Sequence, residues 1–278
     1  VSVPSSVGSK RVMTNVGSQR TQGVSGTVKY SPVYHPEERI NWTLSASFKH
    51  QKAKYEDIGN SLDQFNKENL NTSLVRYYDG GSPTALWAVR SLGINPSDGR
   101  ELFLTKEGTY TFEYDTEDEV VVGNSEPKLE GVLGSTLYWK GFSFSLYFRY
   151  SLGADVFTEA TYNKVENISL AGLKSNQDKR ALHDRWQKPG DHAKFKGISL
   201  TETTPISSRF VLRENYIKAE SISVGYDFES QAVQKLGIQS LRLQANTTDL
   251  FRISSIKEER GIEYPFARSF SFSLSAMF

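Results

Sequence analysis

The most constraining feature of this sequence is an alternation of apolar and polar side chains that recurs along it up to the last residue. In the stretch 141–150 the apolar residues are Phe142, Phe144, Leu146, Phe148 and Tyr150, with Ser143, Ser145, Tyr147 and Arg149 between them. The same pattern occurs in 23–34, 40–50, 221–228, 241–247 and 268–278. Successive side chains of a β-strand point to opposite faces, so these stretches predict strands with one apolar and one polar face. Helical periodicity is scarce, and we therefore expect an all-β protein.

The charged residues in these stretches fall mainly in the polar phase. They are Lys29, Lys49, Arg149, Asp227 and Arg242. Lys218 and Glu220 instead share the parity of Ile222, so in a membrane barrel they would have to lie beyond the rim of the bilayer. A basic residue on the lipid face near mid-membrane costs about 2–4 kcal/mol. A soluble sandwich also alternates, because its outer face meets water, so the charges alone leave both architectures open.

The connections between the predicted strands alternate between short and long. Short turns are expected at 34–40, at Lys140-Gly141 and at 229–237, and long polar loops at about 53–129, 152–212 and 251–265. Short turns on one side and long loops on the other are typical of outer-membrane barrels. The predicted strands are 23–34, 39–52, 131–139, 142–151, 213–228, 238–250 and 266–278.

The stretch 53–129 is the hardest part to interpret. Its segment 84–94, "TALWAVRSLGI", is strand-like and forms either a hairpin within a loop or a further wall strand. The segment 94–102 contains a turn signal at Asp98-Gly99.

Composition excludes several classes of function. Lys and Arg number 33 against 32 Asp and Glu, and no basic stripe is present, so nucleic-acid binding is not expected. Cysteine is absent, which excludes disulfides and thiolate metal sites. No run of about 18 apolar residues predicts a transmembrane helix. The chain does not begin with Met or with a signal peptide, and we expect it to be the mature or proteolysed part of something longer.

No catalytic arrangement of residues emerges, and no cofactor is expected. The four histidines, His35, His50, His183 and His192, are scattered, and neither a phosphate-binding glycine loop nor an H-E-x-x-H motif is present. An acidic cluster at 115–119 is compatible with a cation site, but a solvated loop is the favoured interpretation.

Six segments in order carry a family resemblance. They are 15–28 ("NVGSQRTQGVSGTV"), 120–157, 185–191 ("RWQKPGD"), 207–228, 241–251 ("LRLQANTTDLF") and 264–278. Together they resemble the C-terminal part of SusC/RagA-type TonB-dependent transporters, the nutrient importers of Bacteroidetes outer membranes. The sequence departs from the pattern at Gln22, where Asn is common, and at Ser25, where Glu is common. The segment 112–123 lacks the glycine-rich core of the family's acidic loop, so no metal-binding loop is inferred.

The resemblance implies a 22-stranded outer-membrane barrel with an N-terminal plug. Residues 1–278 would be the C-terminal portion of that barrel, supplying eight to ten strands and no plug. The implied activity is TonB-dependent import of an oligosaccharide or peptide rather than catalysis. The implied partners are a SusD-like surface lipoprotein over the long loops, the TonB complex acting on the plug, the remainder of the barrel and the lipid bilayer. The alternative is a secreted, soluble β-sandwich module that binds glycans.

Several residues are candidates for specific roles. Lumen-facing positions are predicted for Lys49, Arg149 and Arg242, and a C-terminal barrel-assembly signal for Phe270, Phe272, Leu274 and Phe278. Trp42, Tyr138 and Trp139 lie near short turns and fit either an interfacial aromatic girdle or the core of a sandwich. Tyr162, Arg185 and Trp186 in the loop 152–212 are candidate substrate contacts, because aromatic rings stack on ligands and Arg pairs with carboxylates. Packing within the loop is the alternative for these three.

Overall fold

The computed structural model describes residues 15–199, 201–228, 237–257 and 268–278. Its packing divides the chain into two units. The loop unit comprises 1–22, 52–126 and 154–213, and the sheet unit comprises 23–51, 127–153 and 214–278. The expected loops 53–129 and 152–212 supply most of the loop unit. Residues 258–265 of the third expected loop lie outside the described residues.

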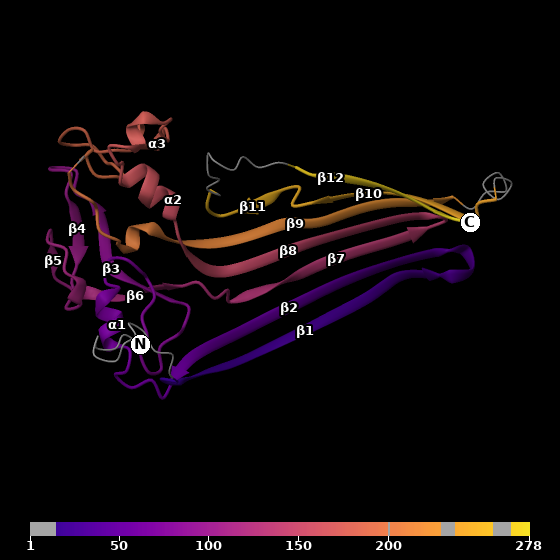
Figure 1. The fold of residues 1–278 in the computed structure, drawn as a ribbon, viewed down its shortest axis with the longest axis horizontal. Coiled ribbons are helices and arrows are strands. Elements are labelled where there is room, and N and C mark those ends of the chain that lie inside the picture. Colours follow the sequence, from indigo (N-terminus) through magenta and orange to yellow (C-terminus); the bar gives the residue numbers. More distant parts are fainter. Residues whose placement is uncertain (1–14, 200, 229–236, 258–267) are drawn as a thin grey trace, which may run out of the picture. The chain divides into compact units, whose positions relative to one another are not determined.

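The sheet unit is built on one antiparallel sheet. Its strands are β1 (Ser18–His35), β2 (Ile40–Glu56), β7 (Leu129–Trp139), β8 (Phe142–Phe157), β9 (Val211–Phe228), β10 (Ser240–Thr248) and β12 (Phe270–Met277), in that spatial order (Figure 1). A short strand, β11 (Arg252–Ser254), also pairs with β9. The seven predicted strands correspond one to one with the seven on the main path. The eight-stranded antiparallel sheet confirms the all-β expectation at the lower end of the predicted strand count.

Tight turns join neighbouring strands as the sequence predicts. Between β7 and β8, Lys140 and Gly141 both have positive φ, 45° and 95°, as a two-residue hairpin requires. Between β1 and β2, the 3-10 turn η2 (Pro36–Glu38) ends at Arg39 in the left-handed conformation. The amide of Lys140 donates to the Arg39 carbonyl at 3.0 Å, which ties these two turns together. The third predicted short turn, 229–237, lies outside the described residues except for Gly237.

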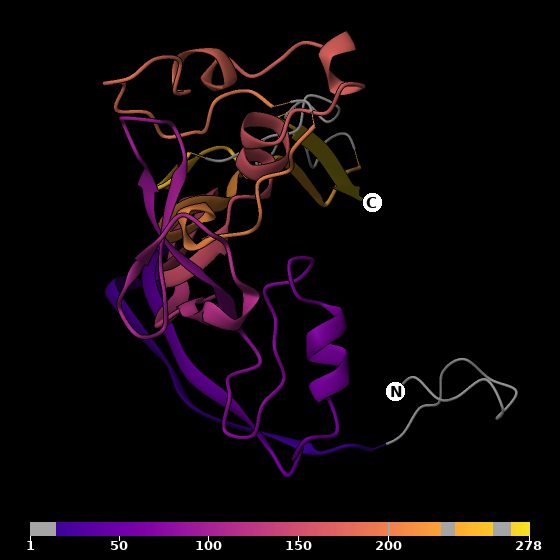
Figure 2. The ribbon, with the colours of Figure 1, turned by 90° about the vertical axis from the view of Figure 1, so that its left-hand side faces the viewer.

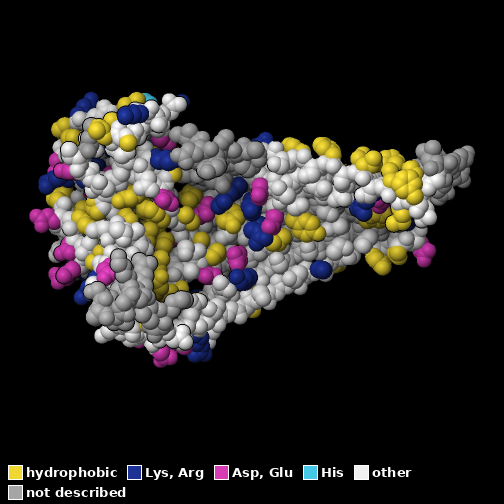
Figure 3. All heavy atoms as spheres, in the orientation of Figure 1, with side chains coloured by type: hydrophobic (Ala, Val, Ile, Leu, Met, Phe, Trp, Pro, Cys, Tyr) yellow, Lys and Arg dark blue, Asp and Glu magenta, His cyan; other side chains and the backbone are white. Residues whose placement is uncertain are grey.

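The register gives the sheet two chemically different faces. On one face, apolar residues lie opposite apolar residues: Phe144 and Leu137, Phe148 and Leu133, and Leu243 with both Tyr226 and Leu274. On the other face, polar residues lie opposite polar residues: Ser145 and Thr136, Thr136 and Thr43, and Gln244 and Ser273. Large apolar side chains remain at the surface, with Phe272 77% and Leu274 68% exposed. Figure 3 shows hydrophobic side chains at the surface over these strands. The described strands of the sheet unit form one sheet.

The loop unit contains a separate four-stranded sheet. Its spatial order is β5 (Tyr110–Thr111), β4 (Glu101–Leu104), β3 (Ala85–Ile94) and β6 (Glu119–Asn124). The strand-like segment 84–94 therefore belongs to a loop sheet and is not a wall strand. It lacks alternation because residues of both parities are buried, including Ala88 and Val89 at 1% exposure each. The predicted turn at Asp98-Gly99 is present, with Gly99 at φ 73°.

Short helical segments complete the loop unit. They are α1 (Asp63–Glu68), η3 (Thr116–Asp118), α2 (Glu159–Thr161), the π-turn η4 (Tyr162–Glu166), η5 (Gly172–Lys174), α3 (Arg180–His183) and η6 (Ser208–Phe210). Figure 2 shows α1 (violet) standing beside the extended segment that follows it in the chain. One apolar core joins Leu74, Leu86, Ala88 and Ile206, and a second joins Val165, Ala181, Phe195 and Phe210.

None of the helices in the described ranges is both long enough and apolar enough to cross a membrane.

One local irregularity of the large sheet depends on a glycine. The Ser47 hydroxyl accepts a hydrogen bond from the amide of Val132 at 2.9 Å, and the Tyr150 hydroxyl donates to the Ser47 carbonyl at 2.9 Å. A side chain at Gly131 would fall directly on that carbonyl oxygen. The close approach of β2 and β7 at this point therefore requires the absence of a Cβ.

We expect Gly131→Val to lower the free energy of unfolding by about 1–3 kcal/mol, because it forces the two strands apart. Chemical denaturation of the protein carrying the substitution measures the loss. Gly197→Ala is the control, because its Cβ would meet only ordinary van der Waals contacts at 3.6 Å or more. Equal stability of the two variants would contradict this interpretation.

Candidate functional site

The loop unit contains a cavity of about 710 Å³ that is lined by both aromatic and charged side chains. We call it the aromatic pocket. Its lining residues are Asp63, Asn66, Lys67, Leu70, Tyr78, Trp87, Thr105, Lys106, Glu107, Thr116, Glu117, Asp118 and Glu119. They come from α1, from the segment after it, from β3, from the β4–β5 turn and from the η3–β6 region. Its volume lies within the range of small-molecule sites.

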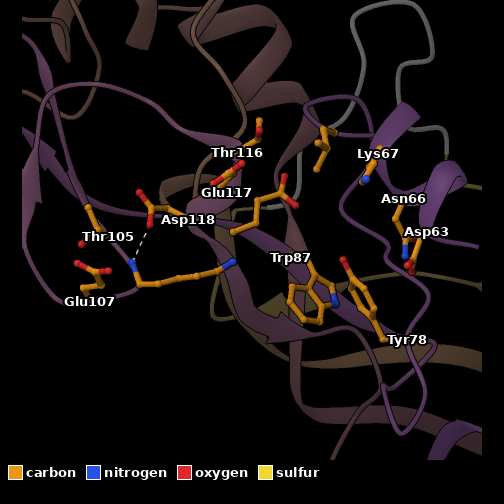
Figure 4. A pocket seen from close by; sticks show the side chains of 13 residues that line it. Asp63, Asn66, Lys67, Tyr78, Trp87, Thr105, Glu107, Thr116, Glu117 and Asp118 are labelled. Carbon is orange, nitrogen blue, oxygen red and sulfur yellow. Dashed lines mark hydrogen bonds between the residues drawn. The ribbon is translucent and has the colours of Figure 1, made fainter. Parts of the chain in front are cut away.

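Two aromatic rings lie between the charged sides of the pocket. The ring centroids of Tyr78 and Trp87 are 5.3 Å apart with the planes tilted by 53°. Tyr78 is 41% exposed, and Trp87 is partly buried. In Figure 4 these rings lie between two groups of polar side chains. Thr105, Glu107, Thr116, Glu117 and Asp118 form one group, and Asp63, Asn66 and Lys67 form the other. This geometry offers two tilted aromatic faces flanked by charges.

The position of Tyr78 is fixed by its neighbour in α1 and by β3. The buried side-chain amide of Asn66 donates to the Tyr77 carbonyl at 2.8 Å and accepts from the Tyr77 amide at 2.9 Å. The Trp87 amide donates to the Leu74 carbonyl at 2.7 Å. Segment 74–78 is thereby held from both sides, and the two rings of the pocket are brought together.

A buried ion pair anchors the same segment to β6. Arg76 Nε and Nη2 donate to the two carboxylate oxygens of Glu119 at 3.0 and 2.8 Å, and Nη1 donates to the carbonyls of Ser73 and Val75. The side chains are 1% and 8% exposed. Burial raises the pKa of the Glu119 carboxyl, while the hydrogen bonds from Arg76 act in the opposite direction. The pair is bidentate, so it fixes orientation as well as charge.

Three acids of the cluster noted in the sequence have side-chain contacts within the protein. Asp115 accepts from the Glu117 amide at 2.8 Å and so caps η3, and Asp118 accepts from the Lys106 amide at 2.9 Å. Glu119 is paired with Arg76. Within the described part of the chain, no group of three or more His, Cys, Asp or Glu residues is placed to hold a metal ion.

Two of the three predicted substrate contacts hold the loop 152–212 together. Arg185 is buried and donates to the carbonyls of Val165, Glu166 and Lys196. Burial lowers the pKa of its guanidinium. Trp186 donates its indole N–H to the Pro96 carbonyl at 2.9 Å, and its ring lies over Gly99.

The third predicted contact, Tyr162, donates to the Thr204 carbonyl at 2.8 Å and packs against the rings of Phe157 and Phe210. The "RWQKPGD" element and Tyr162 thus have structural partners within the loop unit. Substrate contact by any of the three stays a prediction.

A buried charge cluster that the sequence did not suggest lies beside them. Arg209 donates to Glu101 and Glu166, with Nη2 at 3.0 Å from a carboxylate oxygen of each. Ser207 donates to Glu101 at 2.6 Å and Thr204 to Glu166 at 3.0 Å. Burial disfavours the charged form of Arg209, but the hydrogen bonds to the two carboxylates outweigh this cost and raise its pKa. The cluster joins β4, η4 and η6, which are far apart in the sequence.

The three predicted lumen residues lie in the polar phase of their strands, and each has an acidic partner. The pairs are Lys49–Glu130 at 3.0 Å, Arg149–Glu220 at 2.5 Å and Arg242–Asp227 at 3.5 Å. Figure 3 shows basic and acidic side chains lying close together over this sheet. Glu220 shares the parity of the apolar Ile222, yet it forms an ion pair with Arg149, which lies in the polar phase of its strand. That this face lines a lumen, and that Glu220 lies beyond the rim, stay predictions.

The remaining candidates lie at the turns and the C-terminal strand. Trp139 stacks on Phe142 at 6.1 Å and shares the apolar phase with Trp42. Tyr138 instead lies in the polar phase, opposite Asn41, and accepts a hydrogen bond from Arg39. Phe270, Phe272 and Leu274 lie in β12, Phe278 follows it directly, and all four are exposed. A role in barrel assembly stays a prediction.

The comparisons with known proteins agree with this architecture. No family model matches the chain. It is 21% identical over 305 aligned residues to the TonB-dependent receptor P39 of Formosa agariphila, covering 92% of this chain and 28% of that protein. It is 24% identical to the TonB-dependent receptor P26 of the same organism, covering 92% and 27%. The chain thus spans just over a quarter of the length of these relatives.

Solved structures show the same fold. The RagAB peptide importer in its closed-closed state superimposes with a TM-score of 0.71 at 18% identity, over 91% of this chain and 28% of that one. The open-open state of the importer gives a TM-score of 0.68 over 94% of this chain. The antiparallel sheet is therefore part of a larger barrel, as the sequence predicts.

We expect Glu119→Ala to destabilise the pocket by about 3–5 kcal/mol, because it leaves the Arg76 charge buried without its carboxylate partner. Hydrogen exchange of the Trp87 amide, which bonds to Leu74, reports the loss. The double variant Arg76→Met/Glu119→Leu removes both charges and should recover most of the protection. If the Trp87 amide exchanged as fast in the double variant as in Glu119→Ala, the ion pair would not be the contact that anchors segment 74–78.

Proposed function

We propose, on the premise that this chain is a stretch of a SusC/RagA-type TonB-dependent transporter, that it forms part of the wall and outer loops of an importer in the bacterial outer membrane. The observation that carries the proposal is the large antiparallel sheet, whose register keeps apolar side chains on one face and polar side chains on the other. In a membrane barrel the first face meets lipid and the second lines the interior.

The two outer strands of the sheet support a place within a larger barrel. Strands β1 and β12 stand at its ends, and every residue of β12 is exposed. In hydrocarbon each backbone N–H and C=O must have a partner, and only a closed barrel provides one for edge strands. We infer that the remainder of the same barrel pairs with both edges.

The transport cycle is assigned from the family. TonB acts on the plug, outside the 278 residues of this chain, and opens a path through the lumen. That path is lined by side chains that form hydrogen bonds. They are the ion-paired residues Lys49, Arg149 and Arg242 and the serine and threonine residues around them. The cargo class is an oligosaccharide or a peptide.

In this proposal the loop unit forms the extracellular part of the transporter. Its buried charge cluster and its two apolar cores make the loops a folded structure rather than extended chain. A preordered surface of this kind suits the docking of a SusD-like surface lipoprotein, which would deliver cargo to the barrel. The aromatic pocket is the candidate contact for that cargo. Phe278 and the apolar row of β12 would carry the signal for barrel assembly.

We expect Phe144→Arg to block assembly of the transporter in the outer membrane, because it places a charge on the lipid face at a cost of about 2–4 kcal/mol near mid-membrane. Ser145→Arg, on the adjacent residue, is the matched control and should assemble, since it points to the wet face. Heat-modifiable migration of the outer-membrane fraction and uptake of cargo give the two readouts. Equal assembly of both variants would refute the assignment of the faces.

A further inference from the structure

We propose that the aromatic pocket binds a cationic side chain of the cargo, the guanidinium or ammonium group of a basic peptide. The inference rests on the proposed import function and adds the substrate class to it. It is carried by three observations on described residues: an aromatic pair of which Tyr78 is exposed, an excess of carboxylates around it, and two exposed carboxylates in the lining that form no ion pair within the described ranges.

The aromatic pair provides a surface on which a cation can stack. Tyr78 and Trp87 lie in contact between the two charged sides of the pocket, and Trp is the ring that attracts cations most strongly. Asn66, Leu74 and Arg76 fix the segment that carries Tyr78, so a ligand meets rings that are already in place. Such preorganisation reduces the entropy cost of binding.

The charge of the lining selects the sign of the ligand. The carboxylates are Asp63, Glu107, Glu117, Asp118 and Glu119, and the basic residues are Lys67 and Lys106. Arg76 neutralises Glu119. Four carboxylates then face two ammonium groups, which leaves the pocket negative. A cation entering it gains attraction, whereas a sulfated or uronic-acid glycan would be repelled.

Two of these carboxylates remain available to a ligand. The side chains of Glu107 and Glu117 are exposed and form no ion pair with any residue in the described ranges. Both lie on the same side of the pocket in Figure 4. Their negative charge attracts a cation that enters the pocket, whereas a neutral sugar gains no such attraction.

The test compares two peptides that differ only in charge. Acetyl-Gly-Gly-Arg-Gly-Gly-amide and its citrulline counterpart have the same shape, but citrulline is neutral. Calorimetric titration of the purified, full-length transporter should give an affinity for the arginine peptide about tenfold higher than for the citrulline peptide. A neutral oligosaccharide of similar size, added in excess, should not displace the arginine peptide.

The variants locate the effect in the pocket. Glu107→Gln/Glu117→Gln should reduce the preference for arginine over citrulline to about twofold or less, and Tyr78→Ala should weaken binding of the arginine peptide. The matched control is Glu113→Gln, because Glu113 is an exposed acid in the same part of the chain but outside the pocket. This variant should keep the tenfold preference. Equal binding of the two peptides by the unmodified transporter would overturn the inference, as would an undiminished preference in the double variant or displacement by the oligosaccharide.

The same variants separate this inference from the proposed function. If the inference is wrong but the transporter imports, uptake of cargo is TonB-dependent and shows no preference for basic peptides. If the proposed function is wrong, neither the unmodified transporter nor the double variant takes up peptide or oligosaccharide in a TonB-dependent manner. Uptake of basic peptides that falls in the double variant and persists with Glu113→Gln supports both.

Discussion

The architecture depends on one constraint, which is that neighbouring strands keep a register that puts like side chains on the same face. The antiparallel pairing sets Phe144 beside Leu137 and Ser145 beside Thr136, so one face is mainly apolar and the other mainly polar. A slip of one residue would move every apolar side chain to the polar face. The tight turn at Lys140-Gly141 and the close approach at Gly131 fix this register where β7 meets its neighbours.

The loop unit is ordered by a different interaction, the burial of paired charges. Arg76 with Glu119, and Arg209 with Glu101 and Glu166, join segments that are 43 to 108 residues apart. Buried pairs of this kind contribute little net stability compared with apolar packing, but removing one partner is costly, so they specify which segments meet. In this chain the first pair sets the position of the aromatic pocket, and the second cluster joins the loops on which Arg185 and Trp186 lie.

The sheet could be predicted from the sequence almost completely, because alternation with period 2 and Gly-containing turns are local signals. The loop unit could not. β3 is buried at residues of both parities, so it carries no alternation that distinguishes a hairpin within a loop from a wall strand. The partners of Arg185 and Trp186 include Val165 and Pro96, which no local pattern reveals, and substrate contact by these two side chains stays a prediction. Tyr78 and Trp87 meet because contacts with Asn66, Glu119 and Trp87 hold segment 74–78 in place, and nothing in the spacing of the two aromatic residues indicates a pocket.

In the proposed function one face of this sheet meets lipid and the other meets water. This chain contains no cysteine. Once any cysteines elsewhere in the full-length transporter have been replaced, single cysteines can be placed along β8 at positions 143 to 148 and labelled with a nitroxide in a lipid bilayer. Collision rates with oxygen, which partitions into lipid, and with a water-soluble nickel chelate then report each side chain's surroundings. We expect the two collision rates to oscillate in opposite phase with a period of two residues, with oxygen favoured at 144, 146 and 148 and nickel at 143, 145 and 147. Uniform accessibility along the strand, or the reverse phase, would contradict it.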